Sequence, residues 1–413
     1  MKKTCRVPYI LAGLVSAFAT GLLFTWAYFR APLNALFPTW TSADLSMIFS
    51  IHNMVVCTAM ILCGMVAKKT SPRVRIVLAA LLVMIGLGSF PFLPVDNPEL
   101  AFKLAFFLYS FVAPIGAGLA ATTWMGTFVL WVPERPGVMS GGMLLLYGSC
   151  PFFYGALSSV LIPVIGILQT IRVIGLISGV LLLCCLPFVR LPKPEDGLPA
   201  PKVAAVNKTD RSYTTLQMLK TPIFWVMFIF NISMRSAGLI YSDHSAGIAM
   251  SFGVAALFGM IYSPANGSAS IVSGLLLDKL GSVKTMRLFS CILLAASLLL
   301  FVSGFTSIAA IALVGLIGAG FAFGGTGTAN SATVRLFFGP EHYTQNYSTT
   351  TFSIFFASMF CYLAGIVVDK MGGSYYGVYM MTLIFGGIAL ICTILLTILV
   401  RRESRKEEAE RTN

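Results

Sequence analysis

The stretch "VIGLISGVLLLCCLPFV", residues 173 to 189, decides the fold class because it holds no charged residue and consists almost wholly of apolar side chains. It lacks the alternation of apolar and polar residues that marks a transmembrane β-strand, so it predicts a helix. Together with the preceding residues from position 166 on, the run is long enough to cross a hydrocarbon core of about 30 Å. The sequence therefore predicts a membrane-spanning helix here.

Runs of the same kind recur along the chain, and the composition excludes an ordinary water-soluble fold. Hydrophobic residues make up 57% of the 413 residues and charged residues 10%, and the mean hydropathy is +0.87. We predict an all-α polytopic membrane protein with twelve transmembrane helices. The first helix, after "MKKTCR", is expected to be retained rather than cleaved as a signal peptide. The predicted spans are 8–30, 44–67, 74–94, 102–131, 138–160, 166–189, 222–243, 250–277, 285–305, 307–334, 347–368 and 376–400.

The distribution of basic residues predicts the orientation. The N-terminus, the C-terminus and every second connection between predicted helices hold 23 of the 28 Lys and Arg residues. By the positive-inside rule, both termini are expected on the cytoplasmic side of the cell membrane. The net charge of +13 is then a signal of topology with some affinity for anionic lipid, and it requires no nucleic-acid partner.

The chain is expected to consist of two similar halves. "GMVAKK" at 64–69 and "GLLLDK" at 274–279 follow the second helix of each predicted set of six, and "IGAG" occurs at 115–118 and again at 317–320. Such spacing is typical of a duplicated six-helix unit. The expected parts are an N-terminal half at 1–189, a cytoplasmic central loop at 190–221, and a C-terminal half with a short tail at 222–413.

An element after the eighth predicted helix carries a family resemblance. Gly274, Asp278, Lys279 and Gly281 fit the pattern G-x-x-x-D-[RK]-x-G, and with the two six-helix halves they resemble the major facilitator superfamily. The chain is further similar to its oxalate/formate antiporter family, beside the monocarboxylate porters. The resemblance implies a pseudo-symmetric transporter that works by alternating access. The similar stretches are "GLLFTWAYFRAPL" (21–33), "WTSADLSMIFSI" (40–51), "WVPERPGVMSGG" (131–142), "TLQMLKTPIFW" (215–225) and "FFGPEHYTQNYS" (337–348).

Some positions depart from that family. Lys68 stands where the family's first half has an aspartate. The oxalate-type members place an arginine in the eighth helix and a lysine in the eleventh, whereas this chain has Ser270 and no lysine within 347–368. The expected gate residues are Asp278, Lys279, Lys68, Asp243 and His244.

One arginine lies deep in a predicted span. In "NISMRSAGLIYSDHSAG" (231–247), Arg235 is expected about 16 Å inside the membrane, at about 1.5 Å rise per residue. Asn231, Gly238 and Ser242 share its helix face, which predicts a polar and sterically open stripe. Family resemblance implies that this seventh helix lines the central cavity. Arg235 then either anchors an anionic substrate or is a structural arginine bonded to buried polar groups.

Other ionisable groups offer coupling and gating roles. His52 is expected about 12 Å inside the second helix, where it either carries a coupling proton or shares one hydrogen bond as a neutral side chain. Asp243 and His244 are expected near the outer end of the seventh helix, in contact with water. No deep carboxylate is predicted for proton coupling, which favours exchange or uniport unless His52 carries the proton.

Further polar and aromatic residues are candidates for a substrate pocket, because a ring can shape it and an OH or NH can orient a ligand. The alternative for each is packing within the bundle. Besides Arg235 and Asn231, the candidates are Trp26, Tyr28, Trp124, Tyr147, Asn330 and Tyr362.

The sequence thus predicts a secondary transporter of a small organic anion. A single buried cation suits a monocarboxylate, because a second negative charge would remain uncompensated at low dielectric. The alternatives are a neutral or cationic substrate, or a sensor with a transporter fold. We expect no enzyme activity, no cofactor and no nucleic-acid partner, and the nine cysteines show no metal-ligand spacing. The lipid bilayer and a small molecule are the expected partners of a functional monomer.

Overall fold

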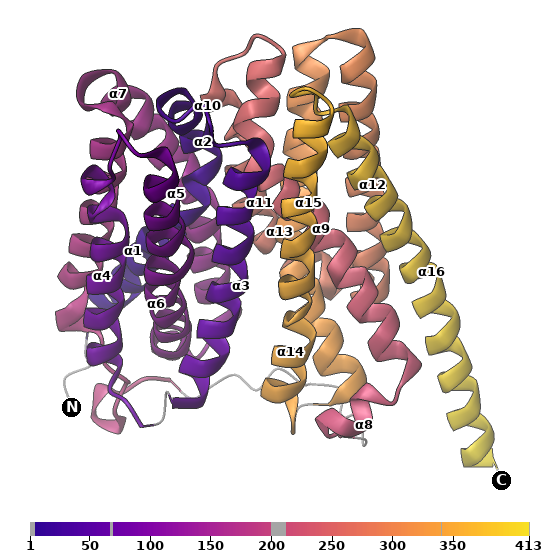
Figure 1. Ribbon diagram of the computed structural model, residues 1–413. Coiled ribbons are helices and arrows are strands. Elements are labelled where there is room, and N and C mark those ends of the chain that lie inside the picture. The colour runs from indigo at the N-terminus through magenta and orange to yellow at the C-terminus, as the bar shows by residue number, and fades with distance from the viewer. Residues whose placement is uncertain (1–4, 67–68, 200–211, 340, 413) are drawn as a thin grey trace.

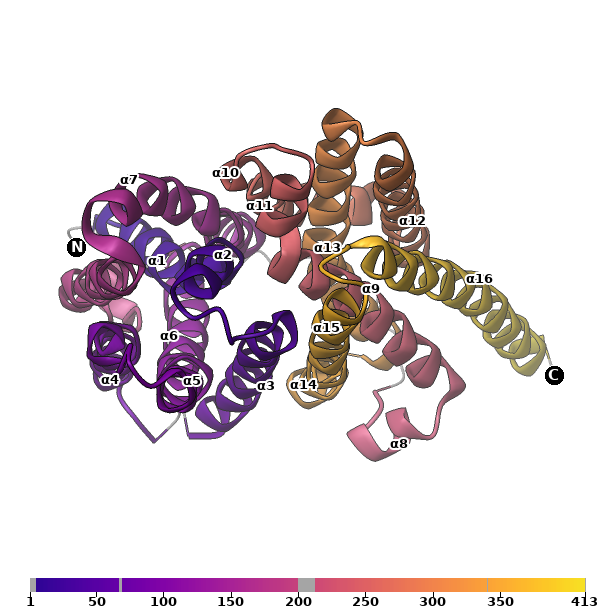
Figure 2. The same cartoon turned by 45° about the horizontal axis from the view of Figure 1, so that its top comes forward.

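The chain forms a bundle of long helices, and the computed structural model describes residues 5–66, 69–199, 212–339 and 341–412. Two groups of helices stand side by side, one built from residues before position 190 and one from residues after 212 (Figures 1 and 2). Within these ranges the structure contains no β-strand, so the predicted all-α fold is confirmed.

The first group begins with one crossing broken into three pieces. Elsewhere in this group, short 3-10 segments follow α4, α6 and α7, and one π-helical turn joins α5 to α6. The elements are α1 (Val7–Thr20), η1 (Gly21–Thr25), α2 (Trp26–Leu36), α3 (Ser42–Val66), α4 (Pro72–Gly88), η2 (Phe90–Phe92), α5 (Pro98–Phe107), η3 (Leu108–Val112), α6 (Ala113–Phe128), η4 (Val129–Trp131), α7 (Pro136–Cys184), η5 (Leu186–Phe188) and η6 (Pro194–Asp196).

The second group follows with α9 as its first long helix. Thr221 caps this helix, accepting from the backbone N–H of Phe224 at 3.3 Å, and Pro222 occupies the first helical position. The elements are α8 (Thr215–Leu219), α9 (Pro222–Ser251), α10 (Ala256–Gly259), α11 (Tyr262–Leu280), α12 (Ser282–Thr306), α13 (Ala309–Phe338), α14 (Tyr343–Thr351), α15 (Ser353–Lys370) and α16 (Tyr376–Thr412).

Nine helices in the described ranges are long and apolar enough to cross a membrane. One of them, Pro136–Phe188, contains two crossings joined at Gly166, whose φ of 76° and ψ of 167° interrupt the helix. The broken first crossing and the serine-rich α11 fall outside the nine. These features reconcile nine continuous apolar helices with the twelve crossings predicted from the sequence. Large apolar side chains are exposed along the described helices, among them Met65, Val164 and Phe305, as expected for a multi-pass membrane protein.

Several helix ends differ from the predicted spans. The eighth span was predicted to begin at 250, but α11 begins at Tyr262, and the twelfth was predicted to end at 400, but α16 continues to Thr412. The seventh crossing was predicted to end at 243, but α9 continues to Ser251, and the first continues past 30 to Leu36. Pro32 and Asn34 lie in the extension of the first crossing, and His244, Ser245 and Ser251 lie in that of the seventh, so hydropathy alone ends both spans early. The two extensions place Arg30 and Asp243 inside helices rather than at their ends.

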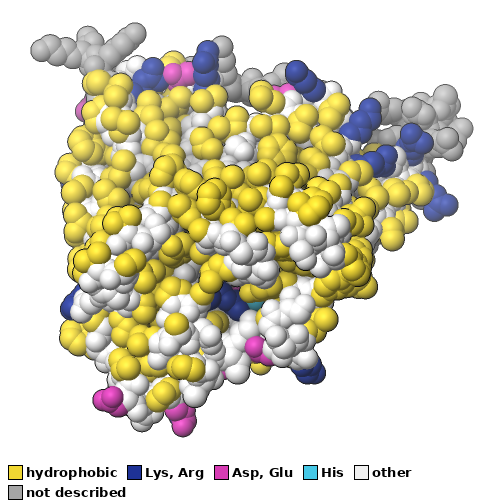
Figure 3. All heavy atoms as spheres, turned by 90° about the horizontal axis from the view of Figure 1, so that it is seen from above, with side chains coloured by type: hydrophobic (Ala, Val, Ile, Leu, Met, Phe, Trp, Pro, Cys, Tyr) yellow, Lys and Arg dark blue, Asp and Glu magenta, His cyan; other side chains and the backbone are white. Residues whose placement is uncertain are grey.

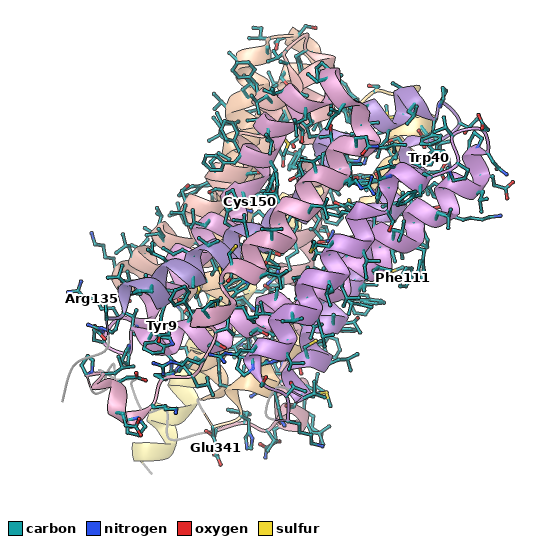
Figure 4. All side chains as sticks on the ribbon, turned by 90° about the vertical axis from the view of Figure 1, so that its left-hand side faces the viewer. Tyr9, Trp40, Phe111, Arg135, Cys150 and Glu341 are labelled. Atoms are coloured by element: carbon teal, nitrogen blue, oxygen red, sulfur yellow. The ribbon has the colours of Figure 1, made fainter. Side chains whose placement is uncertain are left out.

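Both ends of the described chain lie on one side of the bundle, which we call the terminal side (Figure 1). Figure 4 shows Tyr9, Arg135 and Glu341 toward this side and Trp40 toward the opposite side. The two groups of helices meet where α3 packs against α15 and α7 against α11. Near the centre lies α9, the most buried of the candidate spans.

Candidate functional site

Arg235 lies close to the middle of α9. It is thirteen residues beyond Pro222, which corresponds to about 20 Å along the helix. The side chain is buried, with 9% of the residue exposed, and its Nε has no hydrogen-bond partner in the described residues. No carboxylate in the described ranges forms an ion pair with it. Arg75 is also buried without an acidic partner among these residues, but it lies only three residues into α4.

The surroundings of Arg235 place it between the two groups of helices. Cys57 on α3 and Tyr347 on α14 are near enough to interact with its charge. One turn further along α9, a Cβ at Gly238 would lie 2.1 Å from the ring of Phe323, so a side chain there would require α13 to move. A cation is therefore held at mid-depth, at the junction of α3 with the second group.

Asn231 and Asn330, both candidates from the sequence, are brought together. The Asn231 side chain donates to the Asn330 side-chain oxygen and to the Met227 carbonyl, each at 2.8 Å. Asn330 in turn donates to Thr350 Oγ1 at 3.2 Å. Both asparagines are fully buried, so the network ties α9 to α13 and α14 one turn from Arg235. The Asn231 side-chain oxygen has no partner in the described residues.

Two aromatic candidates of the first group also lie together. The rings of Trp124 and Tyr147 are 6.0 Å apart, and Phe24 contacts the other side of Tyr147 at 5.6 Å. The Trp124 indole N–H is buried without a partner in the part of the chain that the structure describes. Tyr147 lies on α7 next to Gly148, where an added Cβ would lie 2.9 Å from the Cα of Gly267 on α11. This aromatic pair is therefore close to the junction of the two groups.

Three further candidates lie elsewhere. Trp26 is fully buried in the first group, where its indole donates to the Leu45 carbonyl at 3.0 Å and its ring packs on Tyr109. Tyr28 lines an apolar cavity of about 380 Å³ on the opposite side, with Ser159 among its other lining residues. Tyr362 is 36% exposed on α15. The structure does not bring these three side chains together with Arg235.

His52 is enclosed in the first group. Its Nδ1 donates to the Tyr109 carbonyl at 3.1 Å, and only 1% of the residue is exposed. The ring lies between Phe49 and Tyr109, at centroid distances of 6.2 and 5.1 Å. This contact fits the alternative in which His52 is a neutral side chain that shares one hydrogen bond with a neighbouring helix.

Asp243 and His244 were expected to contact water, but the structure buries both. They are 0% and 1% exposed, because α9 continues two turns beyond them and the first group covers them. The buried carboxylate of Asp243 lies near the end of the seventh crossing on the side opposite the termini rather than at mid-depth. Asp243 forms an ion pair with Arg30, a residue that the sequence analysis passed over. The available signal was a pair of opposite charges near the same ends of the first and seventh crossings.

Hydroxyl groups of α3 complete this ion pair. Arg30 donates to the hydroxyls of Ser46 and Ser42, each at 2.7 Å, and Ser46 donates to the Asp243 carboxylate at 2.6 Å. His244 Nε2 is 3.4 Å from the same carboxylate. Asp243 and His244 belong to the second group, whereas Arg30, Ser42 and Ser46 belong to the first, so the cluster joins the two groups on the side opposite the termini.

A second contact joins the groups beside this cluster. The carboxylate of Asp369, near the end of α15, accepts from the backbone N–H groups of Ser42 and Ala43 at 2.9 and 2.7 Å. A negative charge at the N-terminus of α3 is favoured by the helix dipole. Figure 3, seen from this side, shows basic atoms in a recess near the centre of the face.

The remaining gate candidates lie on the terminal side. Asp278 and Lys279 are exposed at the end of α11, and within the described ranges neither forms an ion pair. Lys68 lies outside the described residues.

Comparison with known proteins identifies a transporter family and several similar proteins. The family model described as Major Facilitator Superfamily matches residues 9–361 and 233–413. The "Uncharacterized MFS-type transporter YhjX" of Escherichia coli (strain K12) is 24% identical over 347 residues, 82% of each chain. The "Oxalate:formate antiporter" of Oxalobacter formigenes is 25% identical over 343 residues, 82% of this chain and 78% of that protein. Among solved structures, the nucleoside transporter NupG superposes with a TM-score of 0.64 at 14% identity, covering 95% of this chain and 99% of NupG.

Proposed function

The chain belongs to the Major Facilitator Superfamily, and on this premise we propose that its cargo is a small organic anion, specifically a monocarboxylate. It is a multi-pass membrane transporter rather than an enzyme. The proposed mechanism is alternating access: the substrate binds near the bilayer midplane, and the two groups of helices act as the halves at 1–189 and 222–413. In this proposal a solute gradient drives the movement.

The observation that carries this proposal is Arg235. Insertion scales assign a cost of about 2.5 to 3.5 kcal/mol to an arginine at the centre of a membrane helix. An acidic partner would offset that cost, but no carboxylate in the described ranges fills this role. A bound anion would do so, with the planar guanidinium meeting a carboxylate through two hydrogen bonds. The name of the Oxalobacter formigenes relative supports the same class of substrate.

The charge count favours one carboxylate over two. Ser270, where the resemblance implies an arginine in oxalate-type members, donates to the Gly324 carbonyl at 3.4 Å and brings no charge. A dicarboxylate at Arg235 would therefore keep one negative charge uncompensated in a site of low dielectric. Trp124 and Tyr147 supply an indole N–H and a phenol O–H near the junction of the halves, suited to orienting a small anion.

The orientation belongs to the same proposal. We place the protein in the cell membrane with its terminal side facing the cytoplasm, because basic residues are in excess on that side. Arg30–Asp243 and the capping of α3 by Asp369 then hold the external side closed, so Asp243 and His244 act as gate residues in this conformation. One copy of the chain contains all of these groups, which is consistent with a functional monomer.

Counterflow in proteoliposomes tests the substrate class. Vesicles loaded with unlabelled formate, lactate, pyruvate or oxalate are placed in the same labelled anion, and a nucleoside serves as the neutral comparator. We expect accumulation of a monocarboxylate, weaker accumulation of oxalate and none of the nucleoside. Counterflow of the nucleoside without that of any carboxylate would refute an anionic substrate.

A further inference from the structure

Arg30, Ser42 and Ser46 form a second carboxylate site, distinct from Arg235 and on the opposite side of the bundle. Arg30 is 8% exposed and is held in place by the Ser42 and Ser46 hydroxyls, each at 2.7 Å. These groups all belong to α2 and α3. The carboxylate that they bind, that of Asp243, comes from α9 in the other group.

The bound carboxylate fills this site only in part. Arg30 Nη1, Ser46 Oγ and Cys361 Sγ all converge on one oxygen, Asp243 Oδ2. The other oxygen, Oδ1, is buried and has no partner in the described ranges. Arg30 Nη2 donates to Ser42 rather than to the carboxylate. A free carboxylate could approach both Nη atoms in the paired geometry that guanidinium groups favour.

Opening on this side would separate the site from its occupant. Asp243 would move with α9, whereas Arg30 would remain on α2 with its two serines. The other titratable groups around the pair are His244, Tyr375, Cys361 and Asp369. Asp369 is the carboxylate among them, and both of its oxygens are already bonded to the N-terminus of α3. Arg30 would then be a guanidinium without a counter-ion, beside two serine hydroxyls, so a carboxylate from solution could bind it through paired hydrogen bonds.

We propose that Arg30, Ser42 and Ser46 are an entry site for the substrate carboxylate, and that Asp243 is an internal carboxylate that competes with the substrate for it. The substrate binds Arg30 when the opposite side is open. Closure returns Asp243 to Arg30 and displaces the anion toward Arg235. This inference rests on the proposed function for the identity of the ligand, but the site can be tested without transport.

Chemical rescue tests the site directly. Asp243→Ala removes the internal carboxylate and leaves space beside Arg30, so formate should raise the thermal unfolding temperature of this purified variant in detergent. The parent, whose site is filled, and the double variant Arg30→Gln/Asp243→Ala should show a smaller shift, limited to that given by chloride and by formate binding at Arg235. A formate shift of equal size in the single and the double variant would overturn the proposal. This readout does not depend on whether carboxylates are transported.

Sided kinetics provide a second test with a milder variant. Arg30→Lys keeps the charge and loses the fork, so the concentration of labelled formate for half-maximal uptake should rise about tenfold from the external face and little from the cytoplasmic face. Arg172→Gln, which removes an arginine lying over the Phe92 ring and away from the junction, is the matched control. An equal rise at both faces would contradict an entry site. Parent protein that moves no carboxylate would instead refute the proposed function, while the rescue experiment would still decide the site.

Discussion

Arg235 and Asp243 lie eight residues apart on α9 and both are buried, yet among the described residues only Asp243 has a partner of opposite charge. The two positions are separated by about 12 Å along the helix. The same helix thus carries two different charges. The Asp243 carboxylate is neutralised by Arg30 where the two groups meet on the side opposite the termini, and the Arg235 cation at mid-depth has no counter-ion among the described residues. We assign the carboxylate to gating and the cation to substrate binding.

The buried pair should be strongly coupled in stability. Asp243→Asn leaves the charge of Arg30 without its counter-ion, and removing one partner of a buried pair costs about 3 to 5 kcal/mol. Arg30→Gln should have a similar effect, and the double variant should be destabilised by clearly less than the two single effects added together. Thermal or denaturant unfolding of the purified proteins measures this. Strictly additive effects would show that the ion pair does not hold the two groups together.

The asparagine network should separate from substrate binding. Asn231→Ala leaves the Asn330 side-chain oxygen without its donor, which costs about 1 to 3 kcal/mol for a buried polar group. Asn330→Ala should cost a similar amount, with little added in the double variant. If the network is structural, the half-saturating formate concentration of the folded variants should match that of the parent. A large rise for Asn231→Ala alone, at unchanged stability, would instead place the Asn231 side chain at the substrate.

His52 should respond to which nitrogen is replaced. Its contact to the Tyr109 carbonyl uses Nδ1, and an asparagine places its side-chain N–H₂ closer to that position than a glutamine does. We expect His52→Asn to retain more thermal stability than His52→Gln, and both to keep uptake driven by a pH gradient. Loss of gradient-driven uptake in a stable His52→Asn protein, with exchange intact, would assign the coupling proton to this residue.

The topology can be checked with an impermeant thiol reagent. The exposed native cysteines Cys5, Cys184 and Cys291 are first replaced by serine. Lys279→Cys, on the terminal side, should then be labelled only when the cytoplasmic face is accessible, and Lys103→Cys, an exposed position near the start of α5, only from outside. Labelling of Lys279→Cys in intact cells would reverse the assigned orientation.

Much of the fold followed from hydropathy, because each crossing must bury its backbone polar groups within a continuous apolar helix. The same criterion failed at the ends of the first and seventh crossings. The segment "YSDHSAG" (241–247) reads as a polar end, but it is helical and buried because the first group supplies hydrogen-bond partners for it. Pairing between segments 213 residues apart, as for Arg30 and Asp243, leaves no local pattern in the sequence.

The candidate site was predictable in its charged residue but less so in its neighbours. Arg235 was identified because a lone cation in an apolar run is costly wherever it points. Trp26 and Tyr362 were equally plausible from the sequence, yet the first packs inside the first group and the second lies exposed on α15. An aromatic ring is stable in a core, at an interface or against lipid, so its residue type alone does not define its surroundings.

The central claim is that Arg235 binds the carboxylate of the substrate, and counterflow by Arg235→Gln tests it most directly. The control is Arg287→Gln, which removes an arginine of α12 whose guanidinium donates to Thr397 Oγ1 at 2.5 Å. Each reconstituted variant is first shown to be folded by its thermal unfolding. Because charged hydrogen bonds contribute about 1.5 to 3 kcal/mol, formate counterflow should fall at least about tenfold in Arg235→Gln, less in Arg235→Lys, and little in the control. A folded Arg235→Gln protein that exchanges carboxylates at the parent rate would contradict the account.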